Sequence, residues 1–175
     1  HVPSIYTPLW ITLTLPAYIL GFGYFLPVLW NIKIIIAVFY LLCAWIIEKI
    51  LKILDQDNAL VGVAIFALNP LVIIEFLVSA HNDLSMVFFA LLSLYLYLGK
   101  RKISSFFALS LSIAFKQMTI LLIPVFLIKW KRLPAVVLMS MAVLLVSTRR
   151  EILPWYLVWI LIAVTSLFPL LFWYE

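Results

Sequence analysis

Apolar residues along the chain form six or seven long segments that are separated by short polar breaks. Residues 29–54 are numerous enough for a helix that crosses the hydrocarbon core of a bilayer, which is about 30 Å thick. Residues 8–20 would form a helix of only about 20 Å, framed by prolines and by Gly21 and Gly23. This first segment predicts an interfacial or re-entrant helix, and a full span is the weaker alternative.

Breaks within the later segments refine this picture. Residues 59–74 are interrupted by Asn69-Pro70, where proline removes a backbone donor and predicts a kink. Residues 84–99 end at three consecutive cations, and two further segments cover residues 134–146 and 154–174. Residues 103–128 allow either one helix with Lys116 at its centre or two helices that fold back there.

The basic clusters favour the folded-back alternative, because cytoplasmic loops carry the excess of Lys and Arg. If the chain turns back at Lys116, all the clusters lie on the cytoplasmic side, whereas a single helix would place the last one outside. These clusters are Lys49/Lys52, Lys100-Arg101-Lys102 and Lys129/Lys131/Arg132. The same topology gathers other ionisable residues on the extracytoplasmic side, namely Glu75, His81, Asp83, Lys116, Arg149, Arg150 and Glu151.

Composition supports a membrane protein. Of the 175 residues, 67% are hydrophobic and 11% are charged, which is too few charges for the surface of a soluble domain. The net charge of +5 does not indicate nucleic-acid binding, because the cations cluster at the ends of apolar segments. A single cysteine, Cys43, excludes an internal disulfide. We therefore expect an all-α fold, a polytopic transmembrane helical bundle with broken or short helices, in one domain over residues 1–175.

His81, Asn82 and Asp83 stand together at the start of an apolar helix. Asn82 or Asp83 could cap that helix by accepting hydrogen bonds from its first amides. Capping needs one such residue, however, and it does not explain Glu75, an acid in the apolar stretch "LVIIEFLV". An acid there is costly unless it lines a cavity or meets a partner. We expect these residues to begin a helix and also to line a site.

Cations complete the candidate site. Lys116 could simply extend its ammonium to the interface, but carboxylates or an anionic ligand would satisfy its charge better. Arg149 and Arg150 could pair with Glu151 in an exposed loop, or could bind phosphate oxygens in bidentate geometry. Such a set suits a lipid-linked phosphate substrate, with the carboxylates or His81 acting on a hydroxyl or a metal. Asp83 is the candidate metal ligand.

Several motifs in order resemble the polytopic glycosyltransferases of the GT-C superfamily. They are "YTPLW", which begins at Tyr6, "ALNPLVIIEFLVSAHNDLSMVFF", "KQMTILLIPVFLI" and "RREILPWYLVW". The likeness is greatest to mannosyltransferases that depend on polyprenyl-phosphate mannose. It implies transfer of a sugar, mannose in this branch, from a polyprenyl-phosphate donor to a glycan or lipid-linked acceptor at the extracytoplasmic face of a prokaryotic cell membrane.

The resemblance also implies roles for individual residues. Glu75, His81 and Asp83 would be catalytic, shaping the acceptor site or holding a divalent metal. The substrate-binding residues would be Tyr6, Asn82, Lys116, Arg149 and Arg150. The family's general base is a carboxylate of the first extracytoplasmic loop. We expect that loop and its preceding helix to lie mostly upstream of His1, so that residues 1–175 are an inactive fragment.

Two other classes of membrane protein remain as alternatives. A lipid flippase or transporter also contains broken helices and intramembrane charges, but it should spread polar residues along a path. A structural subunit would have no reason to retain Glu75, His81 and Lys116 in apolar surroundings. The gathering of these residues at one face favours an enzyme.

Overall fold

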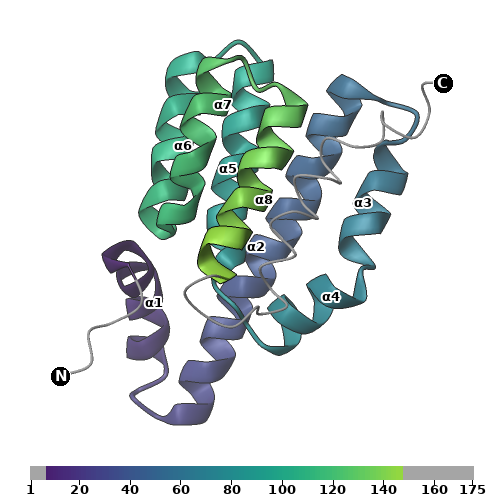
Figure 1. The fold of residues 1–175 in the computed structure, drawn as a ribbon. Coiled ribbons are helices and arrows are strands. Elements are labelled where there is room, and N and C mark those ends of the chain that lie inside the picture. The colour runs from purple at the N-terminus through teal and green to yellow at the C-terminus, as the bar shows by residue number, and fades with distance from the viewer. Residues whose placement is uncertain (1–6, 148–175) are drawn as a thin grey trace.

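The computed structural model describes residues 7–147, and every regular element in this range is a helix (Figure 1). The elements are α1 (Pro8–Leu20), α2 (Phe25–Leu54), α3 (Ala59–Ala67), α4 (Pro70–Val72), the π-helix η1 (Ile73–Val78), α5 (Asp83–Leu98), α6 (Lys102–Phe115), the 3₁₀-helix η2 (Gln117–Leu122), α7 (Ile123–Leu127) and α8 (Arg132–Ser147). The all-helical class expected from the sequence is confirmed for these residues. The segment expected at residues 154–174 lies outside them.

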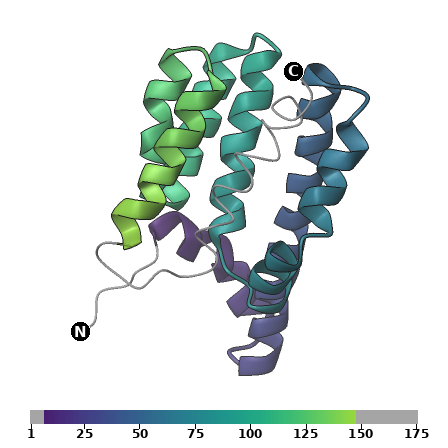
Figure 2. The ribbon, with the colours of Figure 1, turned by 45° about the vertical axis from the view of Figure 1, so that its right-hand side comes forward.

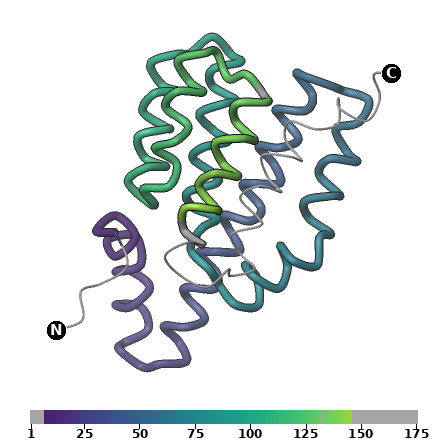
Figure 3. The backbone as a smooth tube through the Cα atoms, viewed as in Figure 1, coloured from purple at the N-terminus to yellow at the C-terminus, as the bar shows by residue number. Residues whose placement is uncertain are grey.

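The helices run up and down between two ends of a bundle. α5, α6, α7 and α8 stand as a group beside α2 and α3 (Figure 2). α6 ends at Phe115, Lys116 is extended with φ −155° and ψ 123°, and the chain returns through η2 and α7. The backbone tube shows this reversal (Figure 3). The fold-back at Lys116 is therefore confirmed, and a single helix over residues 103–128 is wrong.

The predicted break at Asn69-Pro70 is also confirmed. The helical path bends by 48° between the stretches 59–67 and 70–78. Asn69 is extended, as expected for a residue before proline, and its side chain accepts a hydrogen bond of 2.9 Å from the Leu71 amide. The helix then widens into η1 and reaches Val78, four residues beyond the boundary expected from the hydrophobic pattern.

Few of the described helices are long enough to cross a bilayer. Within residues 7–147, α2 alone passes by length and composition, and the bent pair of α3 and residues 70–78 passes if it counts as one span. α1 has 13 residues, as predicted, and the others are similarly short. A polytopic bundle thus remains a prediction, because helices of 13 to 16 residues reach only about 20–24 Å.

Serines let α5 and α6 pack closely. The hydroxyl of Ser105 donates to the carbonyl oxygen of Ser93 over 2.7 Å, and the hydroxyl of Ser93 lies 2.7 Å from the carbonyl oxygen of Ser105. Both side chains are fully buried. Small residues allow two helix backbones to approach, and hydroxyls then bond across the interface. This contact joins α5 and α6 near the turn between them, and the bond from the Ser112 hydroxyl to the Met86 carbonyl joins them nearer the other end.

We expect Ser105→Leu to lower the free energy of unfolding by about 1–3 kcal/mol, because the larger side chain must force α5 and α6 apart. The neighbouring Ser104 is exposed on the same helix, so Ser104→Leu is the matched control. Denaturant titration in detergent micelles would measure both. Equal effects of the two substitutions would contradict the packing argument.

Candidate functional site

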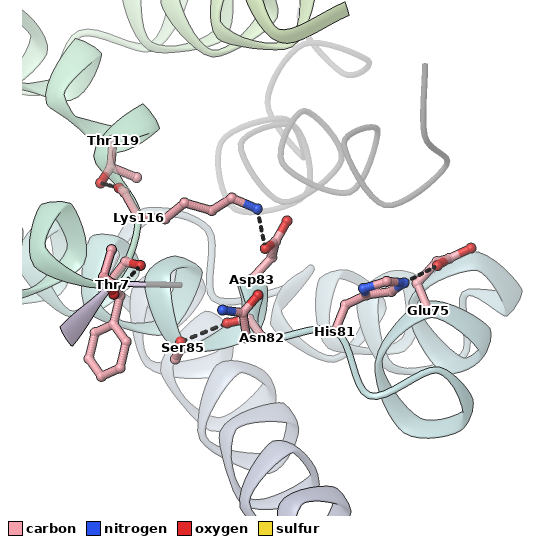
Figure 4. A network of polar contacts seen from close by, with 9 residues as sticks. Thr7, Glu75, His81, Asn82, Asp83, Ser85, Lys116 and Thr119 are labelled. Carbon is pink, nitrogen blue, oxygen red and sulfur yellow. Dashed lines mark hydrogen bonds and ion pairs between the residues drawn. The ribbon is translucent and has the colours of Figure 1, made fainter. Parts of the chain in front are cut away.

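Four ionisable side chains meet at the end of the bundle where α5 begins and α6 ends (Figure 4). Glu75 comes from η1, His81 from the loop before α5, and Asp83 is the first residue of α5. Lys116 comes from the turn between α6 and η2. The structure therefore brings together four residues that the sequence analysis placed on one side of the membrane, although they span more than forty positions of the chain.

Asp83 and Lys116 form an ion pair, in which the ammonium Nζ donates to the carboxylate Oδ1. Asp83 is 1% exposed, whereas the Lys116 side chain keeps 30% of its surface. The anion stands at the N-terminus of α5 and the cation at the C-terminus of α6, where each is favoured by the helix dipole. This pair satisfies the charge of Lys116, as the sequence hypothesis required.

Hydrogen bonds to the backbone hold the Lys116 turn in place. The Thr7 hydroxyl donates to the Phe115 carbonyl over 3.1 Å and ties the start of the described chain to this turn. The Thr119 hydroxyl donates to the Lys116 carbonyl, and the Ser112 hydroxyl donates to the Met86 carbonyl over 2.7 Å. The ammonium of Lys116 is thus presented from a turn that is bonded on both sides.

An apolar floor lies next to the ion pair. The ring of Phe115 stacks on that of Phe89 with centroids 5.3 Å apart, and it meets Phe39 of α2 edge-on at 6.3 Å. Phe88 closes the cluster at 5.8 Å from Phe39. Aromatic side chains exclude water from the base of the site, which strengthens the attraction between the neighbouring charges.

Glu75 and His81 form a second pair, with Nε2 of the imidazole 3.3 Å from Oε2 of the carboxylate. The loop that permits this contact contains Ala80 in the left-handed region at φ 59°, and the His81 amide donates to the Glu75 carbonyl over 3.1 Å. Burial lowers the pKa of His81 below its ordinary value, and the nearby carboxylate of Glu75 opposes that shift. Burial therefore favours the neutral form of the His81 imidazole.

Of the two side-chain caps considered for α5, the one from Asn82 does not form. Asn82 is the N-cap residue, but its φ of −76° and ψ of −4° are helical, and among the described residues its side chain makes no capping bond. Side-chain capping requires an extended N-cap residue. The Asn82 carbonyl instead accepts from the amide and hydroxyl of Ser85, while the Asp83 carboxylate bonds Lys116.

Lys33 of α2 is a cation near this site that the sequence analysis did not single out. Its ammonium donates to the Val78 carbonyl over 2.8 Å, at the C-terminal end of η1. It also lies 6.0 Å from the centroid of the Trp30 ring. A lysine within the apolar run "WNIKIII", on the side that disfavours cations, was the available signal.

Asp83 was the candidate metal ligand. Between residues 7 and 147, no three His, Cys, Asp or Glu side chains are close enough together to hold a metal ion. A metal at Asp83 thus has no supporting ligand set in the described part of the chain. Tyr6, Arg149 and Arg150 lie outside the described residues, and their roles remain predictions.

Comparison with known proteins identifies the family. A family model described as alpha-(1->6)-mannopyranosyltransferase, N-terminal domain, matches residues 1–132 of the 175. No curated protein and no solved structure matches the chain significantly. The match confirms the resemblance to mannosyltransferases, a membrane-associated class of glycosyltransferase. With three quarters of its length matched, the chain belongs to the alpha-(1->6)-mannopyranosyltransferase family.

Proposed function

We propose that the protein transfers mannose from a polyprenyl-phosphate-linked donor to a hydroxyl of a glycan or lipid-linked acceptor, at the extracytoplasmic face of the membrane. The observation that carries this proposal is the meeting of Glu75, His81, Asp83 and Lys116 at one end of an apolar bundle in a mannosyltransferase family. Buried ionisable groups that gather in this way are typical of functional sites in membrane proteins.

The proposed reaction is a substitution at the anomeric carbon of mannose. The acceptor oxygen forms a bond to this carbon, and the bond from the carbon to the donor phosphate oxygen breaks. Polyprenyl phosphate leaves with the electron pair, and the proton of the acceptor hydroxyl passes to a base. Negative charge therefore grows on the leaving phosphate, so cations beside it favour the transition state.

Lys116 is the described cation that we assign to the donor phosphate. Its ammonium has three N–H donors, and its partly exposed side chain can bond phosphate while it still contacts Asp83. Asp83 acts in this arrangement by positioning the ammonium. We assign Arg149 and Arg150 to the same phosphate, as the family resemblance implies, and Tyr6 to substrate binding.

His81 and Glu75 suit the acceptor hydroxyl. A neutral imidazole can both donate and accept hydrogen bonds, and the Glu75 carboxylate favours the tautomer that has its proton on Nε2. The pair therefore can orient a hydroxyl and stabilise positive charge that develops as its proton leaves. Asn82, next in the chain, supplies a further amide for the sugar hydroxyls.

The proposed membrane face rests on the basic turns at the end of the bundle opposite the candidate site. The turns that carry Lys100-Arg101-Lys102 and Lys129-Trp130-Lys131 lie at the other end from Lys116 (Figure 1). Basic turns favour the cytoplasmic side. The end with His81 would then face outward in a chain that crosses the membrane several times.

An assay with two labelled donors tests the proposed function. The complete protein, in membranes, is given radiolabelled polyprenyl-phosphate mannose or GDP-mannose together with a mannoside acceptor. We expect transfer from the polyprenyl donor only. Transfer from GDP-mannose alone would contradict the donor assignment. Translocation of labelled lipid without any transfer would support the flippase alternative instead.

A further inference from the structure

We propose that the end of the bundle opposite the candidate active site binds the phosphate headgroup of an anionic phospholipid. The surface consists of two turns, one between α5 and α6 and the other between α7 and α8. Its cations, which we call the basic end, are Lys100, Arg101, Lys102, Lys129 and Lys131. This inference concerns a different surface from the proposed catalysis and does not depend on it.

Ring contacts directly beneath the two turns place them side by side. Tyr97, three residues before the first turn, lies edge-on to Phe126 of α7 with centroids 5.6 Å apart. Phe106, four residues after the first turn, lies 6.2 Å from the same ring. Phe126 is itself three residues before Lys129. The backbone trace brings both turns to the same end of the bundle (Figure 3). The five cations therefore form one surface.

The two turns of the basic end carry no acidic residue. From residue 84 to residue 150 the sequence contains no Asp or Glu. All five cations are exposed, and none of them pairs with an acid in the part of the chain that the structure describes. Mutual repulsion among these cations is relieved when an anion from outside the chain binds between them.

Apolar side chains around the turns indicate that this anion belongs to a lipid. Ile103, Leu127 and Leu133 flank the two turns and are 77%, 73% and 74% exposed. A soluble polyanion would leave these side chains in water. A phospholipid can cover them with its acyl chains while its phosphate meets the cations, as juxtamembrane basic residues do with anionic lipids.

A hydrogen-bond donor without an acceptor in the second turn also favours a bound headgroup. Trp130 is 9% exposed, and its indole Nε1–H has no acceptor among the described residues. Lys129 and Trp130 both adopt left-handed conformations, with φ of 66° and 54°. A buried N–H without an acceptor is costly, so a headgroup that shifts this turn and exposes the indole would relieve that cost.

Native mass spectrometry of the complete protein in detergent tests this proposal. Phosphatidylglycerol and phosphatidylcholine with identical acyl chains are compared, so that they differ in headgroup charge alone. We expect tighter binding of phosphatidylglycerol. The double variant R101Q/K131Q should weaken that binding by about 25-fold, or about fivefold for each cation removed near an anionic surface.

A charge-preserving variant provides the matched control. R101K/K131R keeps both cations and should retain the preference for phosphatidylglycerol, and circular dichroism should show equal helicity in both variants. Equal affinity for the two lipids in the unmodified protein would overturn the proposal. So would an unchanged preference in R101Q/K131Q, or inorganic phosphate that displaces phosphatidylglycerol when the two are equimolar.

Discussion

Lys116→Met is expected to lower the free energy of unfolding by about 3–5 kcal/mol, because it removes a cation that pairs with the buried carboxylate of Asp83. Asp83→Leu should cost less, about 1–2 kcal/mol, since Lys116 keeps 30% of its side-chain surface and its ammonium can turn to water. The double variant should recover most of the loss. Titration with a denaturing detergent in mixed micelles would measure all three.

The three variants form a double-mutant cycle, and its decisive result is the difference in free energy of unfolding between the two single variants. A purely surface ion pair would give two small and similar effects, of about 0–1 kcal/mol each. If Lys116→Met were no more destabilising than Asp83→Leu, the Asp83 carboxylate would not depend on Lys116. The Glu48–Lys52 pair of α2, which is more exposed on both sides, offers the control, and Lys52→Met should change little.

His81→Asn is expected to reduce kcat/KM for mannosyl transfer by about 10- to 100-fold, because the acceptor hydroxyl loses a hydrogen-bonding partner that carries developing positive charge. Glu75→Gln should cause a smaller reduction. The glutamine oxygen can still accept from Nε2 of His81, but the carboxylate charge is lost. The loss should appear mainly in kcat, since the assigned interaction strengthens in the transition state. Steady-state assays with polyprenyl-phosphate mannose would separate kcat from KM.

Glu48→Gln provides the matched control for this second prediction. It removes the same charge from an acid at the other end of the bundle, so transfer should be unchanged. Circular dichroism should show that all three variants are equally helical. A His81→Asn protein with full transfer activity would remove His81 and Glu75 from the proposed acceptor site.

Hydrophobic spacing was sufficient to predict most of the helices and their order. The break at Asn69-Pro70 follows from the missing donor of proline, and the reversal at Lys116 follows from the preference of basic clusters for one side. The proline rule is local and the rule for basic clusters concerns the whole chain, and neither requires knowledge of how the helices pack. The boundary of the helix before His81 was predicted too early, because η1 continues to Val78 with wider turns that the apolar pattern does not reveal.

The pairing of the candidate-site residues was not predicted, and their roles in the site remain predictions. Charge in apolar surroundings identified Glu75, His81, Asp83 and Lys116, since a bilayer disfavours each of them without a partner. Sequence indicated that carboxylates would satisfy the charge of Lys116 but did not single out Asp83, because that contact depends on the packing of α5 and α6. Nor did the sequence predict that Lys33 of α2 would bond the Val78 carbonyl at the end of η1.

By itself, the sequence predicted an apolar chain that is helical over the residues the structure describes, with its basic clusters at one end and its unusual ionisable residues at the other. These properties depend on the order of residue types, which is read directly. Tertiary structure alone decided which charge meets which, and that Asn82 does not cap α5 with its side chain. Such contacts depend on backbone angles and on helix packing over tens of residues, and residue order constrains neither strongly.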